Sequence, residues 1–473
     1  MAMQEEIVMN EFAQFVLSKL QGSVMLILLA VPLLAVSILT AYFICKKKRK
    51  VFPWRKVITW TLLSGYLLAL IYVTLLRAMP MGHSVNLHLF RAWREAWNSF
   101  SVRNWLNVLL NVAMFIPLGF LLPLVFPKLK KWYTTFGIGF GLSVAIELLQ
   151  LWRCTGVCDV DDLFANTLGT VFGYSLITFI GSFTVKGKTN WKQKLCWGLV
   201  LLLTAGGITG IFVGYELREY GNIPNMASFR VNTSAVHWKL TCSLPEEQKT
   251  MQTYRTKTMT KEDCASLAAK FFETFGIVFD DVQYYDDEAY FMDHGGDDGS
   301  HFLIISYRDG GYDYRGNTHA VDTWADADRE TVMAALEEYP LSIPAEAVFS
   351  VDGDGWHSFT ANRLVDGNFV YDGILRCRYG ADGLIYEVED HLIQYKPYEK
   401  VEIISQDAAF DRLCLGNFSG GDYFEYSDPK DIQVVRAALE YRIDTKGFYR
   451  PVYVFDLMAT DCAYQANVMV RAD

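Results

Sequence analysis

Five polar residues stand where two consecutive apolar segments of the chain meet. Glu147 and Gln150 are three residues apart near the end of one segment, so a helix places them on one face. Arg153 follows at the next helical step, and Asp161 and Asp162 open the next segment. A carboxylate in hydrocarbon costs about 2.5–3.5 kcal/mol on insertion scales, so Glu147 must face helices, water or a partner. We expect an Arg153–Asp162 ion pair, which leaves Glu147 or Asp161 to meet a cationic or hydroxylated ligand.

Three asparagines extend this polar set. Asn107 and Asn111 are four residues apart and share a helical face, and Asn166 follows Asp162 by four residues. A simpler interpretation of Asn107 and Asn111 is interhelical hydrogen bonding, worth about 0.6 kcal/mol each. Asp159 is more typical of a helix N-cap or a solvated loop than of a ligand. The candidate site comprises Asn107, Asn111, Glu147, Gln150, Arg153, Asp161, Asp162 and Asn166.

The apolar segments that position these residues are long enough to cross a membrane. A span needs about 20 apolar residues in a helix. The first run is not a cleavable signal peptide, because Glu5, Glu6 and Glu11 precede it and its positive cluster follows it. The six predicted spans are Val24–Cys45, Val57–Leu76, Asn107–Phe126, Trp132–Trp152, Leu163–Phe183 and Leu195–Tyr215. Gly169-x-x-x-Gly173 and Gly210-x-x-x-Gly214 predict close packing of two of these helices.

Positive charge near the span ends predicts their orientation, since lysine and arginine stay cytoplasmic. Clusters at 46–50, 128–131 and 186–194 follow alternate spans and can all lie inside. The N-terminus, the loops 78–106 and 153–162, and residues 216–473 then lie outside. Three arginines in the loop 78–106 oppose this orientation weakly.

The two halves of the chain differ in charge. The net charge over the 473 residues is −10. Residues 1–215 hold 20 Lys+Arg and 8 Asp+Glu, so this half is basic. Residues 216–473 hold 23 Lys+Arg and 45 Asp+Glu, so this half is acidic. A basic, apolar half joined to an acidic half argues against a cytosolic enzyme and against a nucleic-acid binder. We predict an all-α membrane bundle of six transmembrane helices followed by an extracytoplasmic α+β domain. The expected divisions are 1–56, 57–185, 186–224 and 225–473, the last with a possible break near 344–360.

The predicted extracytoplasmic domain shows helix and strand signals in alternation. Thr260, Asp328 and Ser405 each begin a helical pattern. Alternating segments at His301–Tyr307, Gly373–Tyr379 and Tyr449–Leu457 predict strands.

Cysteine and carboxylate patterns give little sign of a metal or a disulfide framework. Cys154 and Cys158 flank a short turn and could pair, and the five cysteines after residue 216 allow at most two disulfides. Asp352-Gly-Asp354-Gly lacks the later acidic ligands of a calcium loop and is typical of a hairpin turn. The chain has no Cys-x-x-Cys, so zinc is not expected, and we expect no metal or cofactor.

Four pieces of the chain, in order and at matching spacing, resemble the VanZ-like family. They are Asn86-Leu-His-Leu-Phe90, Asn107 to Phe120 with Pro117 and Gly119, Ser143-Val-Ala-Ile-Glu147-Leu-Leu-Gln150, and Gly156 to Tyr174 with Asp161-Asp162. The resemblance covers about residues 60–182, and Thr155 stands where the family often has arginine or lysine. It implies a multi-pass protein of the bacterial plasma membrane, and the named member of the family is associated with low-level resistance to teicoplanin-type glycopeptides.

Residues 370–473 resemble PepSY-like and YycI-like extracytoplasmic modules more weakly, through Tyr371-Asp-Gly-Ile-Leu, Ile403-Ile-Ser-Gln-Asp-Ala-Ala and Pro451-Val-Tyr-Val-Phe. Three functions remain open. In the first, the membrane core contributes to envelope properties such as glycopeptide resistance. In the second, Glu147, Asp161 and Asp162 act as general acid and base on a lipid-linked or amphiphilic envelope substrate. In the third, the exterior domain senses or regulates an envelope partner. The expected partners are membrane lipid and one of three others: a glycopeptide antibiotic, a lipid-linked wall precursor, or a wall or envelope protein. We expect no nucleic acid.

Overall fold

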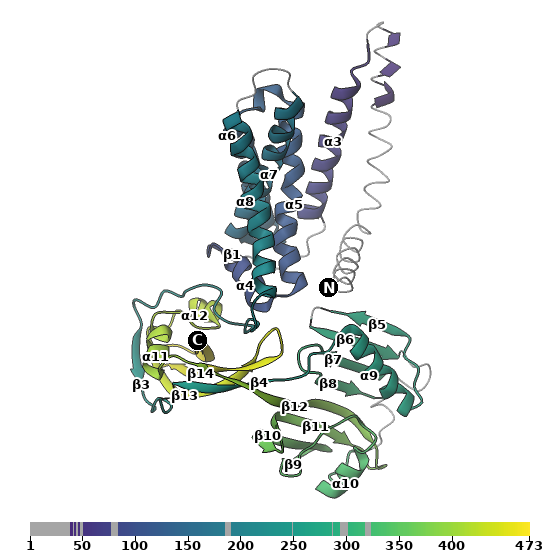
Figure 1. Ribbon diagram of the computed structural model, residues 1–473, viewed down its shortest axis with the longest axis vertical. Helices are drawn as coiled ribbons and strands as arrows, with labels where there is room; N and C mark the ends of the chain where they lie inside the picture. Colours follow the sequence, from purple (N-terminus) through teal and green to yellow (C-terminus); the bar gives the residue numbers. More distant parts are fainter. Residues whose placement is uncertain are drawn as a thin grey trace. The chain divides into compact units, whose positions relative to one another are not determined.

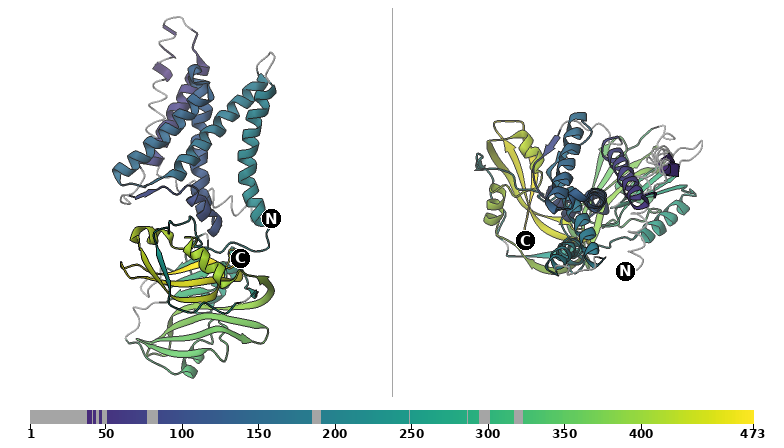
Figure 2. Two further views of the ribbon diagram at one scale, coloured as in Figure 1. Left: turned by 90° about the vertical axis from the view of Figure 1, so that its left-hand side faces the viewer. Right: turned by 90° about the horizontal axis from the view of Figure 1, so that it is seen from above.

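The computed structural model describes residues 38–40, 42–43, 46–47, 51–76, 84–184, 191–247, 249–285, 287–293, 301–316 and 323–473. The predicted first span, Val24–Cys45, therefore lies almost wholly outside the described residues. Contacts divide the chain into two compact units. One unit runs to Ala96 and resumes over Val102–Leu217, and the other holds Trp97–Ser101 and Arg218–Asp473. Long helices make up the first unit and strands most of the second (Figures 1 and 2).

The first unit contains, among its described residues, five helices long and apolar enough to cross a membrane. They are α3 (Trp54–Ile71) with its π-helical continuation η1 (Tyr72–Leu76), α5 (Val102–Val125), α6 (Trp132–Arg153), α7 (Val160–Thr184) and α8 (Trp191–Glu216). These five coincide with the second to sixth predicted spans. Shorter elements join them: β1 (Ser84–Asn86), α4 (Arg91–Ser99), η2 (Pro127–Leu129) and β2 (Val157–Asp159).

Two glycines of α7 allow its backbone to touch that of α5. A Cβ atom added at Gly169 would lie 2.0 Å from the carbonyl oxygen of Val112, and one at Gly173 would lie 2.0 Å from that of Ile116. Real Cβ atoms do not approach an oxygen so closely, so only glycine fits at either position. The predicted packing role of Gly169-x-x-x-Gly173 is confirmed.

The equivalent expectation for α8 is wrong within the described chain. Added Cβ atoms at Gly210 and Gly214 would meet no atom within 4 Å. The spacing alone could not distinguish the two motifs, because it marks a smooth helix face and not the presence of a neighbour.

The second unit is built on a long sheet with short helices. Its strands are β3 (His237–Leu240), β4 (Thr250–Arg255), β5 (Asp281–Tyr284), β6 (Glu288–Asp293), β7 (His301–Ser306), β8 (Tyr312–Arg315), β9 (Val348–Gly353), β10 (Trp356–Asp366), β11 (Phe369–Tyr379), β12 (Ile385–Glu402), β13 (Asp431–Ile443), β14 (Phe448–Ala459) and β15 (Gln465–Arg471). Its helices are α9 (Lys261–Thr274), α10 (Arg329–Ala335), α11 (Gln406–Cys414) and α12 (Gly421–Ser427).

The strand order is β3-β13-β14-β4-β12-β8-β7-β6-β5, and β9, β10, β11 and β15 pair beside this path. The β3–β13 pair is parallel, and the other pairs of this unit are antiparallel. The α+β character expected from the sequence is confirmed in this unit.

Three predicted helix starts are confirmed by side-chain caps. Thr260 accepts a hydrogen bond from the Asp263 N–H in a capping box, and Asp328 and Ser405 accept from the N–H groups three residues ahead. Each cap satisfies one of the N–H groups that the first turn of a helix leaves without an intrahelical partner.

Two large apolar cores support the second unit. One joins α9 and α10 to strands β6 to β12 through residues such as Phe272, Phe291, Phe359 and Leu375. This core includes Ala347 and Phe359, so it continues across the possible break near residues 344–360. The other joins α11 and α12 to β13, β14 and β15. The long strand β12 connects the two halves, since it pairs with β11 and β8 first and with β4 afterwards (Figure 1).

Candidate functional site

A two-stranded parallel ribbon holds the loop that precedes α7. Strand β1 pairs with β2 so that Asn86 lies opposite Asp159. The Asn86 side-chain amide donates to both Asp159 carboxylate oxygens at 3.0 Å. Asp159 Oδ1 also accepts the backbone N–H of Asp161 at 2.8 Å, at the start of α7. The N-cap interpretation of Asp159 is confirmed, and the cap anchors the first turn of α7 to the ribbon.

Asp161 uses its carboxylate to cap a different helix. Its side chain is 2% exposed, and it accepts the backbone N–H groups of Phe90 and, at 2.7 Å, Ala92. Helix α4 begins at Arg91, so these donors belong to its first turn, where intrahelical acceptors are lacking. Its oxygens hold α4 against α7, and the expectation that Asp161 meets a ligand stays a prediction.

Glu147 is engaged in the same way. It is 3% exposed, and its Oε2 accepts the Asp159 backbone N–H at 3.0 Å. The hydrogen bond links the C-terminal part of α6 to the strand β2 that leads into α7. This contact supports the loop, and the expectation that Glu147 meets a ligand stays a prediction.

Arg153 and Gln150 bind backbone carbonyls instead of a carboxylate. Gln150 Nε2 donates to the Thr74 carbonyl at 2.9 Å, and Arg153 Nη1 donates to the Leu75 carbonyl. Both carbonyls lie in the last turn of η1, where a helix leaves its acceptors unpaired. The expected Arg153–Asp162 ion pair is not formed among the described residues, because the nearer free carbonyls take the guanidinium.

Asp162 instead meets an amide of α5. The Asn111 side-chain amide donates to Asp162 Oδ1, so the predicted polar face of α5 does contact the acidic start of α7. Further along α7, Asn166 Nδ2 donates to Ser143 Oγ of α6 at 2.9 Å. Asn166 is 3% exposed and lies inside the bundle, where it joins two helices.

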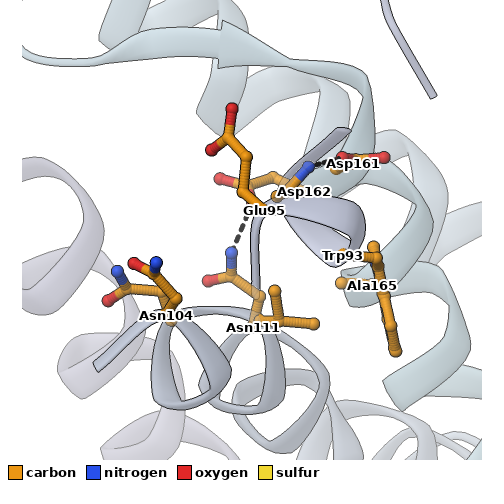
Figure 3. Close-up of a pocket in the computed structure, with 10 residues that line it drawn as sticks. Trp93, Glu95, Asn104, Asn111, Asp161, Asp162 and Ala165 are labelled. Carbon is orange, nitrogen blue, oxygen red and sulfur yellow. Dashed lines mark hydrogen bonds between the residues drawn. The ribbon is translucent and has the colours of Figure 1, made fainter. Parts of the chain in front are cut away.

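A small pocket opens beside Asp162, between α4, α5 and α7. It has a volume of about 100 Å³ and brings Glu95 and Asp162 together with the carboxamides of Asn104, Asn107 and Asn111. Figure 3 shows the Asn111 side chain directed at Asp162, with Glu95 beside it. Four predicted residues line the pocket (Asn107, Asn111, Asp161 and Asp162), and the other four do not (Glu147, Gln150, Arg153 and Asn166).

Two residues of the pocket that carry a carboxylate or a carboxamide, Asn104 and Glu95, were not predicted from the sequence. Asn104 precedes Asn107 and Asn111 by three and seven residues, so its spacing alone places it on their helical face. Glu95 had no such signal, because its position depends on how α4 folds back over α5 and α7. In the structure Glu95 pairs with Arg91 at 2.8 Å, one turn earlier on α4.

The pocket is suited to a single cationic or hydroxyl-bearing group. The three carboxylates in its lining, Glu95, Asp161 and Asp162, attract positive charge, and carboxamides donate to and accept from a hydroxyl. A volume of about 100 Å³ holds roughly three waters, so it can receive an end group and not a whole amphiphile. Among the described residues no cluster of three or more His, Cys, Asp or Glu side chains could hold a metal ion. The eight described cysteines, Cys154 and Cys158 included, are free thiols.

The different roles of the two neighbouring aspartates predict different stabilities. Asp161→Ala removes the acceptor of two N–H groups of α4 and should destabilise the protein by about 1–2 kcal/mol, the usual cost of a lost cap. Asp161→Asn keeps one acceptor and should recover part of that loss. Thermal unfolding of the purified protein in detergent measures this, with Asp162→Ala as the matched control. An Asp161→Ala protein as stable as the wild type would contradict the capping role.

Comparison with known proteins identifies one family. Residues 63–181 match the VanZ/LLP1 family model. No curated protein matches the chain significantly. An uncharacterized protein from Eubacterium rectale is 11% identical, covering 47% of this chain and 82% of its own, with a TM-score of 0.23. The C-terminal domain of Bacillus megaterium YpeB is 10% identical, covering 46% and 94%, with a TM-score of 0.18.

At these TM-scores the two structural likenesses carry no further argument. The family match covers helices α5 and α6 in full and α7 up to residue 181, together with α4 and the ribbon that positions their polar residues. It also contains every residue of the pocket. This chain is therefore a membrane protein with a VanZ-like domain over residues 63–181.

Proposed function

We propose that this VanZ-like protein acts at the outer face of the bacterial plasma membrane. It receives the cationic or hydroxylated end group of an envelope amphiphile in the pocket at Asp162, and it thereby lowers susceptibility to teicoplanin-type glycopeptides. The observation that carries the proposal is the meeting of Asp162 and Glu95 with three asparagines of α5 in one small pocket.

The position of the pocket supports this role. Asp162 lies in the first turn of α7, at the end of an apolar helix, where the polar end of a membrane amphiphile would lie. The lysine clusters of the chain predict that this end faces outward. A carboxylate at this depth is retained at a cost, which favours a functional role.

The structure also narrows the acid–base alternative. Glu147 does not line the pocket, and both oxygens of Asp161 accept N–H groups of α4, so Asp162 is the carboxylate we propose to exchange a proton with a substrate there. A changed lipid or muropeptide profile on expression, lost in Asp162→Asn, would favour that chemistry over binding alone.

Glycopeptide susceptibility tests the proposal directly. In a sensitive Gram-positive host, the wild type should raise the inhibitory concentration of teicoplanin at least fourfold and leave that of vancomycin unchanged. Asp162→Ala and Asn111→Ala should return it to the level of the host, because each removes one side of the contact that lines the pocket. Immunoblots of membrane fractions establish equal insertion.

Asp366→Ala is the control, since it removes an exposed carboxylate at the end of β10 in the second unit and should keep full resistance. Full resistance in inserted Asp162→Ala would overturn the proposal. Loss of resistance on deletion of residues 225–473 would move the activity to the C-terminal domain and favour the regulatory alternative.

A further inference from the structure

Strand β12 changes partners at one point, and a groove opens there. Up to Tyr395 it pairs with β11, and from Lys396 onward it pairs with β4. Pro397 follows at once and has no N–H for the ladder, and the register shifts between Pro397 and Lys400. The strand therefore bends away from β11 and leaves the end of the β10–β11 hairpin without a full backbone partner.

Two adjoining pockets occupy this break. Their volumes are about 590 and 750 Å³, and both are lined by Phe369, Lys396 and Pro397. We call the two together the β12 groove. Each volume is in the range of pockets that hold small ligands, so the β12 groove is large enough for a head group and a short chain.

Three exposed cations line the β12 groove: Arg255, Lys257 and Lys396. None of them forms an ion pair in the part of the chain that the structure describes. The only carboxylate in the lining is Asp309, whose Oδ1 accepts the Gly311 N–H at 3.1 Å. This local positive charge stands in a region with 23 Lys+Arg against 45 Asp+Glu, where unpaired cations would be expected to find acidic partners.

The strand register makes this arrangement costly without a counter-ion. Arg255 and Lys396 are direct cross-strand partners, and like charges directly opposite each other destabilise a sheet. Each lies over an aromatic ring: Arg255 is 5.0 Å from the ring centre of Phe448, and Lys396 is 5.4 Å from that of Phe369. The rings hold the two side chains in place at the groove, where an anion between them would relieve the repulsion.

Apolar surface continues from the cations along the hairpin. Phe369 and Pro397 line both pockets, and Val365, which lines the larger one, is 67% exposed. An anion of purely polar character would leave this surface in water. A ligand with an acyl chain beside its anionic group would cover it.

We propose that the β12 groove binds an anionic amphiphile, with a phosphate head group between Arg255, Lys257 and Lys396 and its acyl chain along Phe369, Pro397 and Val365. Arginine and lysine are the usual partners of phosphate oxygens. This site is separate from the pocket at Asp162, and it stands or fails independently of the function proposed there.

Lysine footprinting of the full-length protein in neutral detergent tests this site. Acetylation by an amine-reactive ester is followed at each lysine by mass spectrometry, with and without dihexanoylphosphatidylglycerol. The acetylation rates of Lys257 and Lys396 should fall at least threefold, and that of the exposed Lys239 on β3 should not change. Arg255→Gln should abolish the protection of Lys396. Asp309→Asn removes the carboxylate from the lining, so Lys396 should be protected at a lower ligand concentration.

Two matched ligands decide between the parts of the proposal. Dihexanoylphosphatidylcholine has the same chains without net charge, and glycerol 1-phosphate has the anion without chains, so both should protect several-fold less. Equal protection by the choline lipid would overturn the role of the cations. Equal protection by glycerol phosphate would show a free-phosphate site and overturn the role of the apolar wall. No protection by any of the three would overturn the site.

Discussion

Replacing Gly173 with alanine should lower the unfolding temperature of the membrane unit sharply. The added Cβ atom would lie 2.0 Å from the Ile116 carbonyl oxygen and 3.0 Å from the Phe120 nitrogen, both backbone atoms of α5. Backbone cannot swing aside as a flexible side chain does, so the two helices must separate. Overpacking in a close-packed interior usually costs about 1–3 kcal/mol, and we expect a value at the upper end. Thermal unfolding of the protein in detergent measures the effect.

The chain supplies its own control for this prediction. Gly210 and Gly214 have the same spacing on α8, but an added Cβ atom meets nothing within 4 Å. Gly210→Ala should therefore leave the unfolding temperature unchanged or raise it slightly, since alanine favours helix over glycine by about 1 kcal/mol. If Gly173→Ala and Gly210→Ala lowered the unfolding temperature equally, the close contact between α5 and α7 would not be the reason for glycine at position 173.

The second unit should lose stability as the pH rises from 6 to 8. Burial, with smaller contributions from neighbouring carboxylates, raises the pKa of Asp390 from 3.8 to about 7. The unfolded chain releases this proton near pH 4 and the folded chain only near pH 7, so the free energy of unfolding falls across that interval. The full shift corresponds to at most about 4 kcal/mol between pH 4 and pH 7, of which about 1.4 kcal/mol falls above pH 6. Partial exposure of the side chain reduces both figures.

His391 acts in the same direction. Its Nε2 lies 2.9 Å from Asp313 Oδ1, and this hydrogen bond raises the pKa of His391 above 6.5. The protonated, paired form is favoured in the folded state, so its contribution is present at low pH and is lost as the pH rises through the folded pKa. Unfolding midpoints at pH 6 and pH 8 measure the sum of the two effects.

Two variants separate these groups. Asp390→Asn cannot ionise, so it should be more stable than the wild type at pH 8 and should reduce the difference between pH 6 and pH 8. Asp313→Asn weakens the pairing of His391, so it should remove only the contribution of His391 to the stability difference between pH 6 and pH 8. A wild-type protein with equal midpoints at both pH values would contradict the assignment.

Local patterns in the sequence predicted much of the fold because their causes are local. Apolar length gave the five described membrane helices, and Thr260, Asp328 and Ser405 identified three helix starts through caps that act within four residues. The polar face of α5 followed from spacing alone, and Asn107 and Asn111 do line the pocket.

The partners of the polar residues could not be predicted in this way. The sequence placed Glu147, Asp161 and Arg153 near the right helix ends, but backbone N–H and carbonyl groups of α4, β2 and η1 compete for them. A helix end offers such unpaired groups only where the chain brings it within reach, and that depends on the whole bundle.

The sequence by itself thus determined the membrane segments, the capped helices and the acidic, strand-rich second unit, since hydrophobic length, caps and charge act on neighbouring residues. Only the tertiary structure decided that Asp162 and Glu95 share a pocket while Asp161 holds a helix. It also decided that Gly173 meets a neighbour where Gly214 does not. Both outcomes depend on which helix lies alongside, a long-range contact that spacing along one helix does not encode.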